Sequence, residues 1–566
     1  MEKLFTKRGL SLPEVPWDVY PRPQMVREEW LCLNGMWNLT VRGKSFRKDA
    51  LSHGSIRVPF CAESLLSAVS FPCRVGDELQ YARNFTLPAD WVGKRILLHF
   101  GAVSRRTEVA VNGKICCRHD NGYLPFSADI TSLIKQGKNE LTVLAVNDLT
   151  PLQPYGKQSK KRGGMWYTPC SGIWQTVWLE CVPEKYIRAL HIRTDRTSAE
   201  ITAEGVEDGV VEVDGQHFPL TGGKASVTIP SPHCWTPEDP FLYPFTVTAG
   251  EDKVVSYFAL RELTVERVGG KKRIFLNGKP FFFHALLDQG YWSDGLYTPA
   301  DPICYEEDIL YAKSLGFNTL RKHAKIEPEL YYAACDRLGM IVFQDMVNAG
   351  AYSYLRDTVL PTLHFQMRND THLHRNPDGR RNFLHAMEET VSVLGSHPCL
   401  CLWTIFNEGW GQFCADDAYR KLKALDPSRL INSTSGWFHQ KESDVDAQHL
   451  YFEALHLGKR TELPQMITEF GGYVWKDKEH SFNREKTYGY RKYGTREELA
   501  DALREVYGRI LPPLVREGLC GAVYTQLSDV EDETNGLLTF DRAVQKIRPE
   551  DLADLSEQLQ QILQEA

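Results

Sequence analysis

Residues 400–410 have the sequence LCLWTIFNEGW, an apolar run that stops abruptly at the polar residues Asn407 and Glu408. Residues 465–472, QMITEFGG, have the same construction and stop at Glu469. Short, nearly continuous apolar runs are typical of strands that are buried on both faces, as in a parallel sheet. The two stretches therefore predict two buried strands, each with a glutamate at its carboxyl end.

Apolar runs of the same kind recur through residues 266–566 and alternate with segments of helical character at 305–315, 327–338 and 382–394. Strand–helix alternation predicts a parallel sheet, and eight such strands predict a closed (β/α)8 barrel. The fifth to seventh strands are closely spaced, so we expect short or missing helices there. The eight predicted strands are residues 280–287, 318–323, 340–346, 400–407, 430–433, 447–451, 465–469 and 521–527.

The first 265 residues have a different pattern, in which short β-branched and aromatic runs are separated by turn signals. Runs at 95–100, 107–111 and 141–146 are divided by turn sequences such as Asn112-Gly113. This pattern predicts a β-sandwich over residues 1–183. Residues 184–265 have the short strands of a small immunoglobulin-like sandwich.

The composition is that of a globular protein. Of the 566 residues, 42% are hydrophobic and 25% are charged, which excludes a disordered or fibrous chain. The net charge of −7 does not favour a nucleic-acid partner, and we interpret the basic cluster at 157–162 as a solvated loop. No stretch is apolar enough for a membrane span and the amino terminus has no export signal, so we expect a cytoplasmic protein with reduced cysteines.

The two glutamates at predicted strand ends are the most informative chemical feature. In a barrel, the carboxyl ends of the strands form the active face, so both side chains are expected to point into one pocket. Two such carboxylates can hydrolyse an acetal, because one donates a proton while the other attacks the anomeric carbon. The alternative is that each glutamate caps a helix or pairs with an arginine. The repeated arrangement, with glycine behind and aromatic residues beside each glutamate, favours catalysis.

Several longer motifs resemble glycoside hydrolase family 2, the group of β-galactosidases, β-glucuronidases and β-mannosidases. They occur in the family's order and extend over nearly the whole chain. The resemblance implies a jelly-roll sandwich (1–183), an immunoglobulin-like sandwich (184–265) and a TIM-barrel catalytic domain (266–566). Besides the two glutamate stretches, the motifs are residues 21–37 (PRPQMVREEWLCLNGMW), 172–180 (GIWQTVWLE), 316–323 (GFNTLRKH) and 335–346 (CDRLGMIVFQDM).

The resemblance also implies roles for five residues. Glu408 would be the general acid/base and Glu469 the nucleophile. Asn407 would hydrogen-bond the sugar 2-hydroxyl, and Arg321 would keep the nucleophile ionised, because an adjacent cation lowers a carboxylate pKa. Tyr451 would be a phenol partner of Glu469.

Seven further residues at or near predicted strand ends, or with aromatic rings, are candidate sugar-binding groups. Polar side chains could bind hydroxyls and aromatic rings could stack on a sugar face, whereas the alternative for each is an ordinary loop or core position. The candidates are Asp288, Gln289, His323, His449, Trp410, Trp437 and Tyr524.

One competing constellation is Asp370-Thr371-His372-Leu373-His374, whose His-x-His pair could hold zinc. It lies in a polar stretch after the third predicted strand, so we favour a solvated or substrate-facing loop. We expect no metal and no organic cofactor.

These observations favour a retaining exo-β-glycosidase that acts on a carbohydrate substrate through a covalent glycosyl-enzyme. Two other classes stay open: a non-catalytic carbohydrate-binding relative, and a metal-dependent barrel hydrolase. Assembly into a homo-oligomer is left open. For the sugar, β-galactosidase is the first choice because it is the commonest activity in the family, and a β-hexuronidase (galacturonidase or glucuronidase) is the alternative.

The region after the eighth predicted strand bears on this choice. Family β-glucuronidases bind the sugar carboxylate through an Asn-x-Lys motif just before a Gly-aliphatic run. Here the residues before Gly536 are Glu533, Thr534 and Asn535, so the lysine is missing. Because an unpaired buried carboxylate is costly, we expect a neutral hexoside to be preferred over a glucuronide. The alternative is that Lys322 or another basic residue binds the carboxylate.

Overall fold

A computed structural model of the chain describes residues 3–43, 54–363, 365, 369–460 and 462–565. The amino-terminal part forms two antiparallel sheets that share one hydrophobic core. Along β2 (Gly35–Arg42), side chains alternate between buried and more exposed positions, as expected where a sheet covers a core with one face. One sheet has the order β1 (Trp30–Cys32), β12 (Val177–Val182), β5 (Arg95–Phe100), β9 (Phe126–Asp129). The other has the order β3 (Gly54–Val58), β2, β4 (Glu78–Thr86), β10 (Lys138–Val146), β7 (Arg106–Val111), β8 (Lys114–Asp120).

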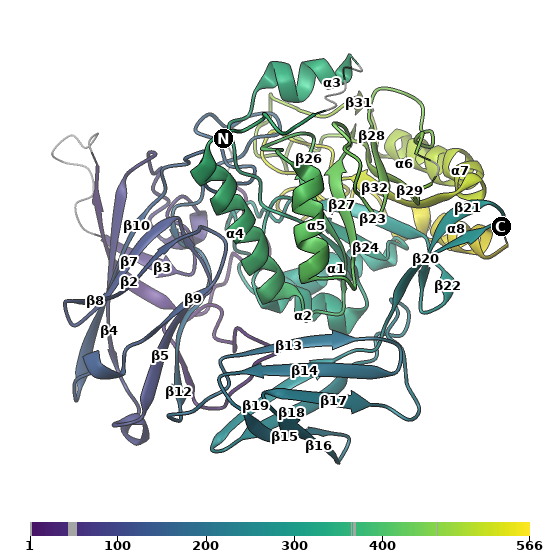
Figure 1. Ribbon diagram of the computed structural model, residues 1–566. Helices are drawn as coiled ribbons and strands as arrows, with labels where there is room; N and C mark the ends of the chain where they lie inside the picture. Colours follow the sequence, from purple (N-terminus) through teal and green to yellow (C-terminus); the bar gives the residue numbers. More distant parts are fainter. Residues whose placement is uncertain (1–2, 44–53, 364, 366–368, 461, 566) are drawn as a thin grey trace.

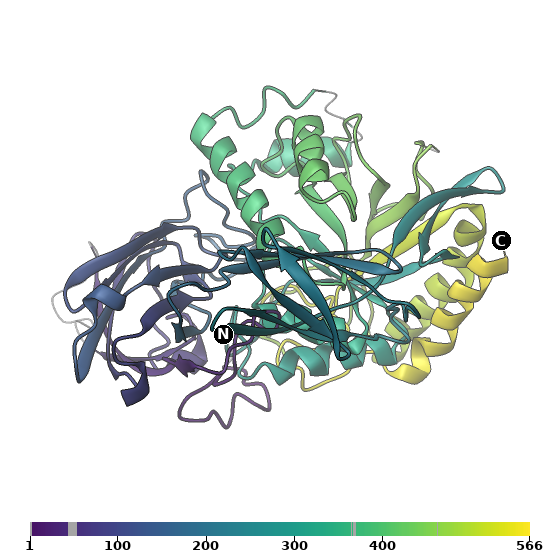
Figure 2. The same cartoon turned by 60° about the horizontal axis from the view of Figure 1, so that its bottom comes forward.

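The middle part is a seven-stranded antiparallel sheet with a core of its own. Figure 1 shows this sheet below the barrel, and Figure 2, with the bottom turned forward, shows it in front of the barrel, between the amino-terminal sandwich and the carboxyl-terminal helix. Its order is β13 (Ala189–Thr194), β14 (Ser198–Glu204), β17 (Lys224–Thr228), β16 (Gln216–Thr221), β15 (Asp208–Val213), β18 (Tyr243–Ala249), β19 (Asp252–Phe258).

The carboxyl-terminal part is a nearly closed barrel of eight parallel strands (Figure 1). Every ladder in it is parallel, and among the described residues no ladder joins the two end strands β27 and β28. The strand order is β27 (Leu430–Ser435), β26 (Leu400–Asn407), β25 (Ile341–Asp345), β24 (Thr319–Lys322), β23 (Phe283–Asp288), β32 (Leu519–Thr525), β29 (Gln465–Gly471), β28 (Asp446–Leu450).

Helices pack around this barrel, and α4 and α5 cover its near side in Figure 1. The α-helices are α1 (Ile303–Ser314), α2 (Glu329–Leu338), α3 (Leu360–Thr362), α4 (Pro377–Leu394), α5 (Ala415–Leu425), α6 (Arg496–Glu505), α7 (Leu511–Glu517) and α8 (Pro549–Glu565). Shorter helical turns are η1 (Leu65–Ser67), η2 (Ala89–Trp91), η3 (Thr131–Leu133), η4 (Leu355–Val359) and η5 (Val506–Ile510). None of the helices in the described ranges has the length and apolar character that crossing a membrane requires.

The remaining strands form small sheets. They are β20 (Leu263–Val268), β21 (Lys271–Leu276) and β22 (Lys279–Pro280) in one sheet, β6 (Val103–Ser104) with β11 (Gly172–Ile173) in another, and β30 (Tyr473–Val474) with β31 (Arg491–Lys492) in a third.

All eight predicted barrel strands overlap observed ones. The close spacing after the fifth strand has the expected consequence, because the described residues form no helix between β27 and β28 or between β28 and β29. Loop side chains take over the packing there: Asp444 accepts hydrogen bonds from the Ile431 N–H (2.8 Å) and from the Lys423 ammonium (2.9 Å).

The interpretation of residues 157–162 as a solvated loop is wrong for Lys157. Residues 147–171, which connect β10 to β11, form a loop that leaves the sandwich and lies on the carboxyl face of the barrel; we call it the bridging loop. The Tyr155 N–H donates to the Asn348 carbonyl (3.0 Å), and the Thr168 N–H donates to Glu531 (2.9 Å). These contacts bury Lys157, whereas Lys160 on the same loop stays exposed.

Candidate active site

Glu408 and Glu469 face each other at the carboxyl end of the barrel. Glu469 lies in β29, and Glu408 directly follows β26 in a left-handed conformation (φ +51°). The Glu408 N–H donates to the Ser435 carbonyl (2.9 Å) and the Trp437 indole donates to the Glu408 carbonyl (3.1 Å), which hold this unusual backbone. One carboxylate oxygen of each glutamate lies within 4.8 Å of the other.

Glu469 is held as a buried, ionised carboxylate. Arg321 Nη1 donates to its Oε1 (2.9 Å), and the Tyr451 hydroxyl donates to its Oε2 (2.6 Å). Burial raises its pKa, but the neighbouring His449, Arg321 and His323 and the Tyr451 hydrogen bond outweigh burial and lower the pKa to about 2. Glu469 therefore has the charge and the surroundings of a nucleophile.

Arg321 links Glu469 to two other groups. Its guanidinium binds both oxygens of Asp345 (3.0 and 2.9 Å) and donates to Asn407 Oδ1 (2.7 Å). Asp345 in turn hydrogen-bonds His323 Nδ1 (2.6 Å). Such a bidentate arginine fixes direction as well as charge, so Asn407 and Glu469 are oriented by a single side chain.

His449 lies between the two glutamates. Its Nδ1 is 2.9 Å from Glu408 Oε1, and its Nε2 is 2.9 Å from Ser435 Oγ and 3.6 Å from Glu469 Oε1. The ring contacts Trp437 edge-on, with centroids 5.6 Å apart. One imidazole thus contacts both catalytic candidates.

The structure brings together most of the residues singled out from the sequence. Four of them bond Glu408 or Glu469 directly, namely Arg321, His449, Tyr451 and Trp437. Asn407 is joined to Glu469 through Arg321, and His323 is joined to it through Asp345 and Arg321. Trp410 lies close by, with its ring centroid 6.1 Å from that of His323.

Asp288, Gln289 and Tyr524 are placed differently, and no hydrogen bond among the described residues joins them to either glutamate. Both oxygens of Asp288 are occupied, by Lys322 Nζ (2.6 Å) and by the Gly290 N–H (2.8 Å). Tyr524 is fully buried and its hydroxyl accepts the Tyr473 N–H (3.3 Å), so its ring offers no face to a sugar. Gln289 is buried, and its Oε1 has no hydrogen-bond partner in the described part of the chain.

Sequence reasoning missed Asp345, Ser435 and Lys157. Asp345 ends β25 and Ser435 ends β27, so the strand-end signal that singled out the glutamates would also have found them. Lys157 carries no such signal, because it belongs to a loop of another domain that is brought to the barrel only by folding.

The His-x-His stretch does not form a metal-binding cluster within the described residues, where the one candidate cluster consists of Glu408, His449 and Glu469. Asp370 Oδ2 accepts hydrogen bonds from Gln412 Nε2 (3.0 Å) and the Ala415 N–H (3.0 Å). Its carboxylate therefore anchors the start of α5.

The acidic residues before Gly536 are buried, and each has its own partners. Asp529 forms an ion pair with Lys546 (2.5 Å). Glu531 accepts the Thr168 N–H, and Glu533 accepts hydrogen bonds from the Tyr167 hydroxyl and from Asn535 Nδ2 (3.2 Å). These acids therefore hold the bridging loop and the neighbouring chain in place.

Three protein-family models match the chain in succession. The model described as glycosyl hydrolases family 2, sugar binding domain, matches residues 63–183. The model described as glycosyl hydrolases family 2 matches residues 186–261, and that described as glycosyl hydrolases family 2, TIM barrel domain, matches residues 268–479.

Individual relatives include enzymes named for different sugars. A β-glucuronidase of Felis catus is 26% identical over 499 residues, which cover 76% of this chain and 72% of the relative. A β-galactosidase of Aeromonas hydrophila is 25% identical over 481 residues, which cover 75% of this chain and 43% of that longer protein. The crystal structure of a β-galacturonidase from Eisenbergiella tayi bound to galacturonate has a TM-score of 0.70 at 21% identity and covers 95% of this chain and 99% of its own. This last likeness shows the shared fold.

Proposed function

The chain belongs to glycoside hydrolase family 2, and from this premise we propose that it is a retaining exo-β-glycosidase with Glu469 as nucleophile and Glu408 as general acid/base. The single observation that carries the proposal is that an oxygen of the Glu408 carboxylate and an oxygen of the Glu469 carboxylate lie within 4.8 Å of each other. Retaining glycosidases hold their carboxyl groups about 5–5.5 Å apart, whereas inverting enzymes need roughly 6.5–9.5 Å to admit a water molecule. The separation here favours direct attack by a carboxylate.

In the first step, a Glu469 oxygen attacks the anomeric carbon while Glu408 donates its proton to the departing glycosidic oxygen. The alcohol leaves, and the sugar is bound to Glu469 as an ester. In the second step, the Glu408 carboxylate takes a proton from water, whose oxygen attacks the anomeric carbon and releases Glu469. The sugar leaves with its β configuration retained.

The surrounding contacts support this division of roles. Arg321 and Tyr451 each occupy one oxygen of Glu469, which keeps the carboxylate charged and fixes its plane. Because Asn407 Oδ1 accepts from Arg321 (2.7 Å), its Nδ2 group is left to donate to a sugar 2-hydroxyl. A hydrogen bond there strengthens as the oxocarbenium-like transition state develops.

For the sugar, we favour a β-hexuronide over the β-galactoside that the sequence first suggested. Relatives named as β-glucuronidases and a structural neighbour named as a β-galacturonidase support this choice. Because one relative is named as a β-galactosidase, a neutral β-hexoside is the alternative substrate.

The finer domain assignment is part of the same proposal. We assign residues 1–183 to a jelly-roll sandwich, 184–265 to an immunoglobulin-like sandwich and 266–566 to the catalytic barrel. The separate cores of the first two parts support the division.

The test combines stereochemistry with a substrate panel. The purified protein is incubated with nitrophenyl β-galacturonide, β-glucuronide, β-galactoside and β-glucoside, and the first product anomer of each active substrate is identified by proton NMR before mutarotation. We expect a hexuronide to have the highest kcat/KM and the β-anomer to appear first. First appearance of the α-anomer would contradict the retaining mechanism, and a neutral hexoside as best substrate would contradict the sugar assignment.

A further inference from the structure

A buried cation beside Glu408 and Glu469 has no anionic partner in the part of the chain that the structure describes. Lys157, in the bridging loop, is only 6% exposed. Within the described ranges, no carboxylate lies within 4.0 Å of its Nζ and no acceptor forms a hydrogen bond with it. Burying a charge is costly unless the charge is paired. The missing partner is therefore expected on a ligand.

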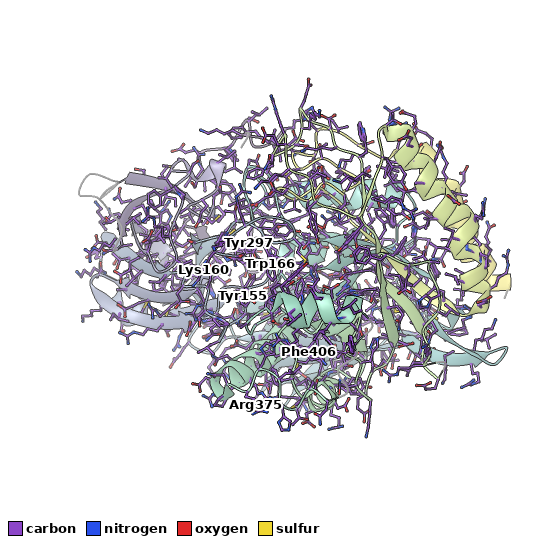
Figure 3. All side chains as sticks on the ribbon, turned by 90° about the horizontal axis from the view of Figure 1, so that it is seen from above. Tyr155, Lys160, Trp166, Tyr297, Arg375 and Phe406 are labelled. Carbon is purple, nitrogen blue, oxygen red and sulfur yellow. The ribbon has the colours of Figure 1, made fainter. Side chains whose placement is uncertain are left out.

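Two aromatic rings fix the position of this ammonium. Nζ lies 4.4 Å from the ring centroid of Trp410 and 6.0 Å from that of Trp166, and the two ring centroids are 5.4 Å apart. Trp410 follows Glu408 by two residues, and Trp166 belongs to the bridging loop. Contacts with ring faces hold a cation in place without neutralising it. Figure 3 shows Trp166, Tyr155 and Lys160 of this loop where the sandwich meets the barrel.

The charges that act on Lys157 are those of the catalytic pocket. Burial lowers its pKa, whereas the negative charges of Glu533, Glu408 and Glu469 raise it. All three carboxylates therefore lie close enough to influence Nζ, yet none is close enough to form an ion pair with it. We infer that the ammonium faces the space in which a sugar on Glu469 would lie.

Glu533 does not take up the charge of Lys157. One of its oxygens accepts the Tyr167 hydroxyl and the other accepts Asn535 Nδ2 (3.2 Å). Neutral donors therefore satisfy this carboxylate, and the ammonium stays available.

The other buried lysines near the site are already paired. Lys322, the alternative considered from the sequence, binds Asp288 (2.6 Å) and Glu327 (2.9 Å), and Lys325 also binds Glu327 (2.8 Å). A substrate anion would have to displace these contacts to use either residue. Lys157 requires no such displacement.

We propose that Lys157 binds the C6 carboxylate of a terminal hexuronic acid, so that a residue of the amino-terminal sandwich determines the sugar specificity of the barrel. The proposal rests on the glycosidase function proposed above. It supplies the cation that Glu533-Thr534-Asn535 lacks in place of the family's Asn-x-Lys motif. A buried ammonium–carboxylate pair of this kind is a strong, charge-assisted contact.

The test compares two sugars that differ only at C6. For the wild type, Lys157→Met and the control Lys160→Met, kcat/KM is measured on nitrophenyl β-galacturonide and β-galactoside, and again on β-glucuronide and β-glucoside. Lys160 is exposed on the same loop, so its substitution removes the same charge without touching the site. Thermal unfolding of each variant shows that it is folded, and binding of free galacturonate and glucuronate is measured by calorimetry.

We expect Lys157→Met to lower kcat/KM on the uronide by at least about thirtyfold relative to the matched neutral hexoside, the size expected for loss of one partner of a buried charge pair. Lys160→Met should leave the ratio unchanged. Equal losses on both sugars would overturn the proposal. If the wild type hydrolyses no glycoside, that result contradicts the proposed glycosidase function but not the carboxylate subsite. Lys157-dependent binding of the free uronate would then still support the subsite, and binding that is absent or unaffected by Lys157→Met would overturn it.

Discussion

At the scale of single residues, the charge state of Glu469 decides whether the site can work. Its carboxylate is buried, and burial alone would favour the neutral acid. The neighbouring His449, Arg321 and His323 and the Tyr451 hydrogen bond reverse that preference and lower the pKa to about 2. Glu469 is therefore ionised throughout the ordinary pH range, and the proposed mechanism assigns to Glu408 the proton that is needed for departure of the alcohol.

Substitution of Tyr451 tests this electrostatic account. Tyr451→Phe removes the 2.6 Å hydrogen bond to Glu469 Oε2, so the pKa of Glu469 should rise. A hydrogen bond to a charged group is worth about 1.5–3 kcal/mol, which corresponds to roughly one to two pH units. Since Glu469 must be deprotonated to attack, the acid limb of kcat/KM should move to higher pH by about that amount, as measured by a pH–rate profile on an aryl glycoside.

Tyr524→Phe is the matched control, because that hydroxyl contacts the Tyr473 N–H and not a glutamate. The acid limb of kcat/KM in Tyr524→Phe should lie at the same pH as in the wild type. An unshifted acid limb in Tyr451→Phe would mean that the hydrogen bond does not set the charge of Glu469.

At the scale of elements, the site depends on how closely the end of β27 approaches β28. Gly436 follows β27 with φ +92°, and a Cβ built there would lie 2.7 Å from Cγ and Nδ1 of His449. That ring hydrogen-bonds Glu408 (2.9 Å). The glycine thus allows the imidazole to lie between the carboxylates of Glu408 and Glu469.

Gly436→Ala should displace His449 and reduce kcat/KM by tenfold or more (about 1.4 kcal/mol per tenfold). It should also reduce the free energy of unfolding by about 1–2 kcal/mol through left-handed backbone strain. Gly215→Ala is the control, because Gly215 has φ +73° and nothing within 4 Å of its added Cβ. The control should lose comparable stability but no activity, as measured by denaturant unfolding and steady-state rates. Equal activity in the two variants would contradict a role for this close approach.

The elements also show how far sequence reasoning extends. Barrel strands such as β26 and β29 were predictable because a strand buried on both faces needs a continuous apolar run, which is a local signal. Glu408 and Glu469 followed from parallel register, which brings all carboxyl ends to one face. Asp288 has the same strand-end position, but its charge is taken up by Lys322 on the neighbouring strand, and that pairing is visible only in three dimensions.

The contribution of the bridging loop could not be predicted in this way. Lys157 lies in a polar, glycine-flanked stretch that is typical of a solvated loop. It is buried because other residues of the bridging loop bind Asn348 and Glu531, which are far away in the sequence. Tertiary contacts between domains overrode the local pattern.

At the scale of the whole molecule, the proposed active site needs the sandwich and the barrel in a fixed arrangement, because the bridging loop belongs to the sandwich and Glu408 and Glu469 belong to the barrel. A buried ionic cluster around Arg27 helps to fix the sandwich relative to the middle sheet. Arg27 binds Glu180 of β12 (3.1 Å) and Asp252 of β19 (2.8 Å), so it joins the sandwich to the middle sheet. Burial raises the pKa of Glu180, but Arg22, His99 and Arg27 outweigh it and hold the pKa below its ordinary value.

Arg27→Met should reduce the free energy of unfolding by about 3–5 kcal/mol, because it leaves two buried carboxylates short of a partner. Arg95→Met, which breaks an ion pair with Asp129 that is 34% and 43% exposed, should cost about 0–1 kcal/mol. Denaturant unfolding monitored by tryptophan fluorescence measures both values.

The pH dependence of stability has a definite sign. A depressed carboxyl pKa contributes stability above the unfolded-state pKa, and the contribution is lost as the pH falls through the folded-state value. Arg27→Met should therefore unfold at a higher pH than the wild type on acid titration. A similar loss of stability in Arg27→Met and Arg95→Met would show that the buried ionic cluster does not stabilise the contact between the sandwich and the middle sheet.

The measurement that tests the central claim most directly is identification of the residue that becomes glycosylated. The wild type is incubated with a 2-deoxy-2-fluoro β-hexuronide, and in parallel with its neutral counterpart, each carrying a good leaving group; the protein is then digested and mapped by tandem mass spectrometry. The account predicts one sugar per chain, bound to Glu469 within ITEFG (467–471), and no adduct in Glu469→Ala. An adduct on another residue, or turnover of the parent glycoside without any trapped ester, would contradict it.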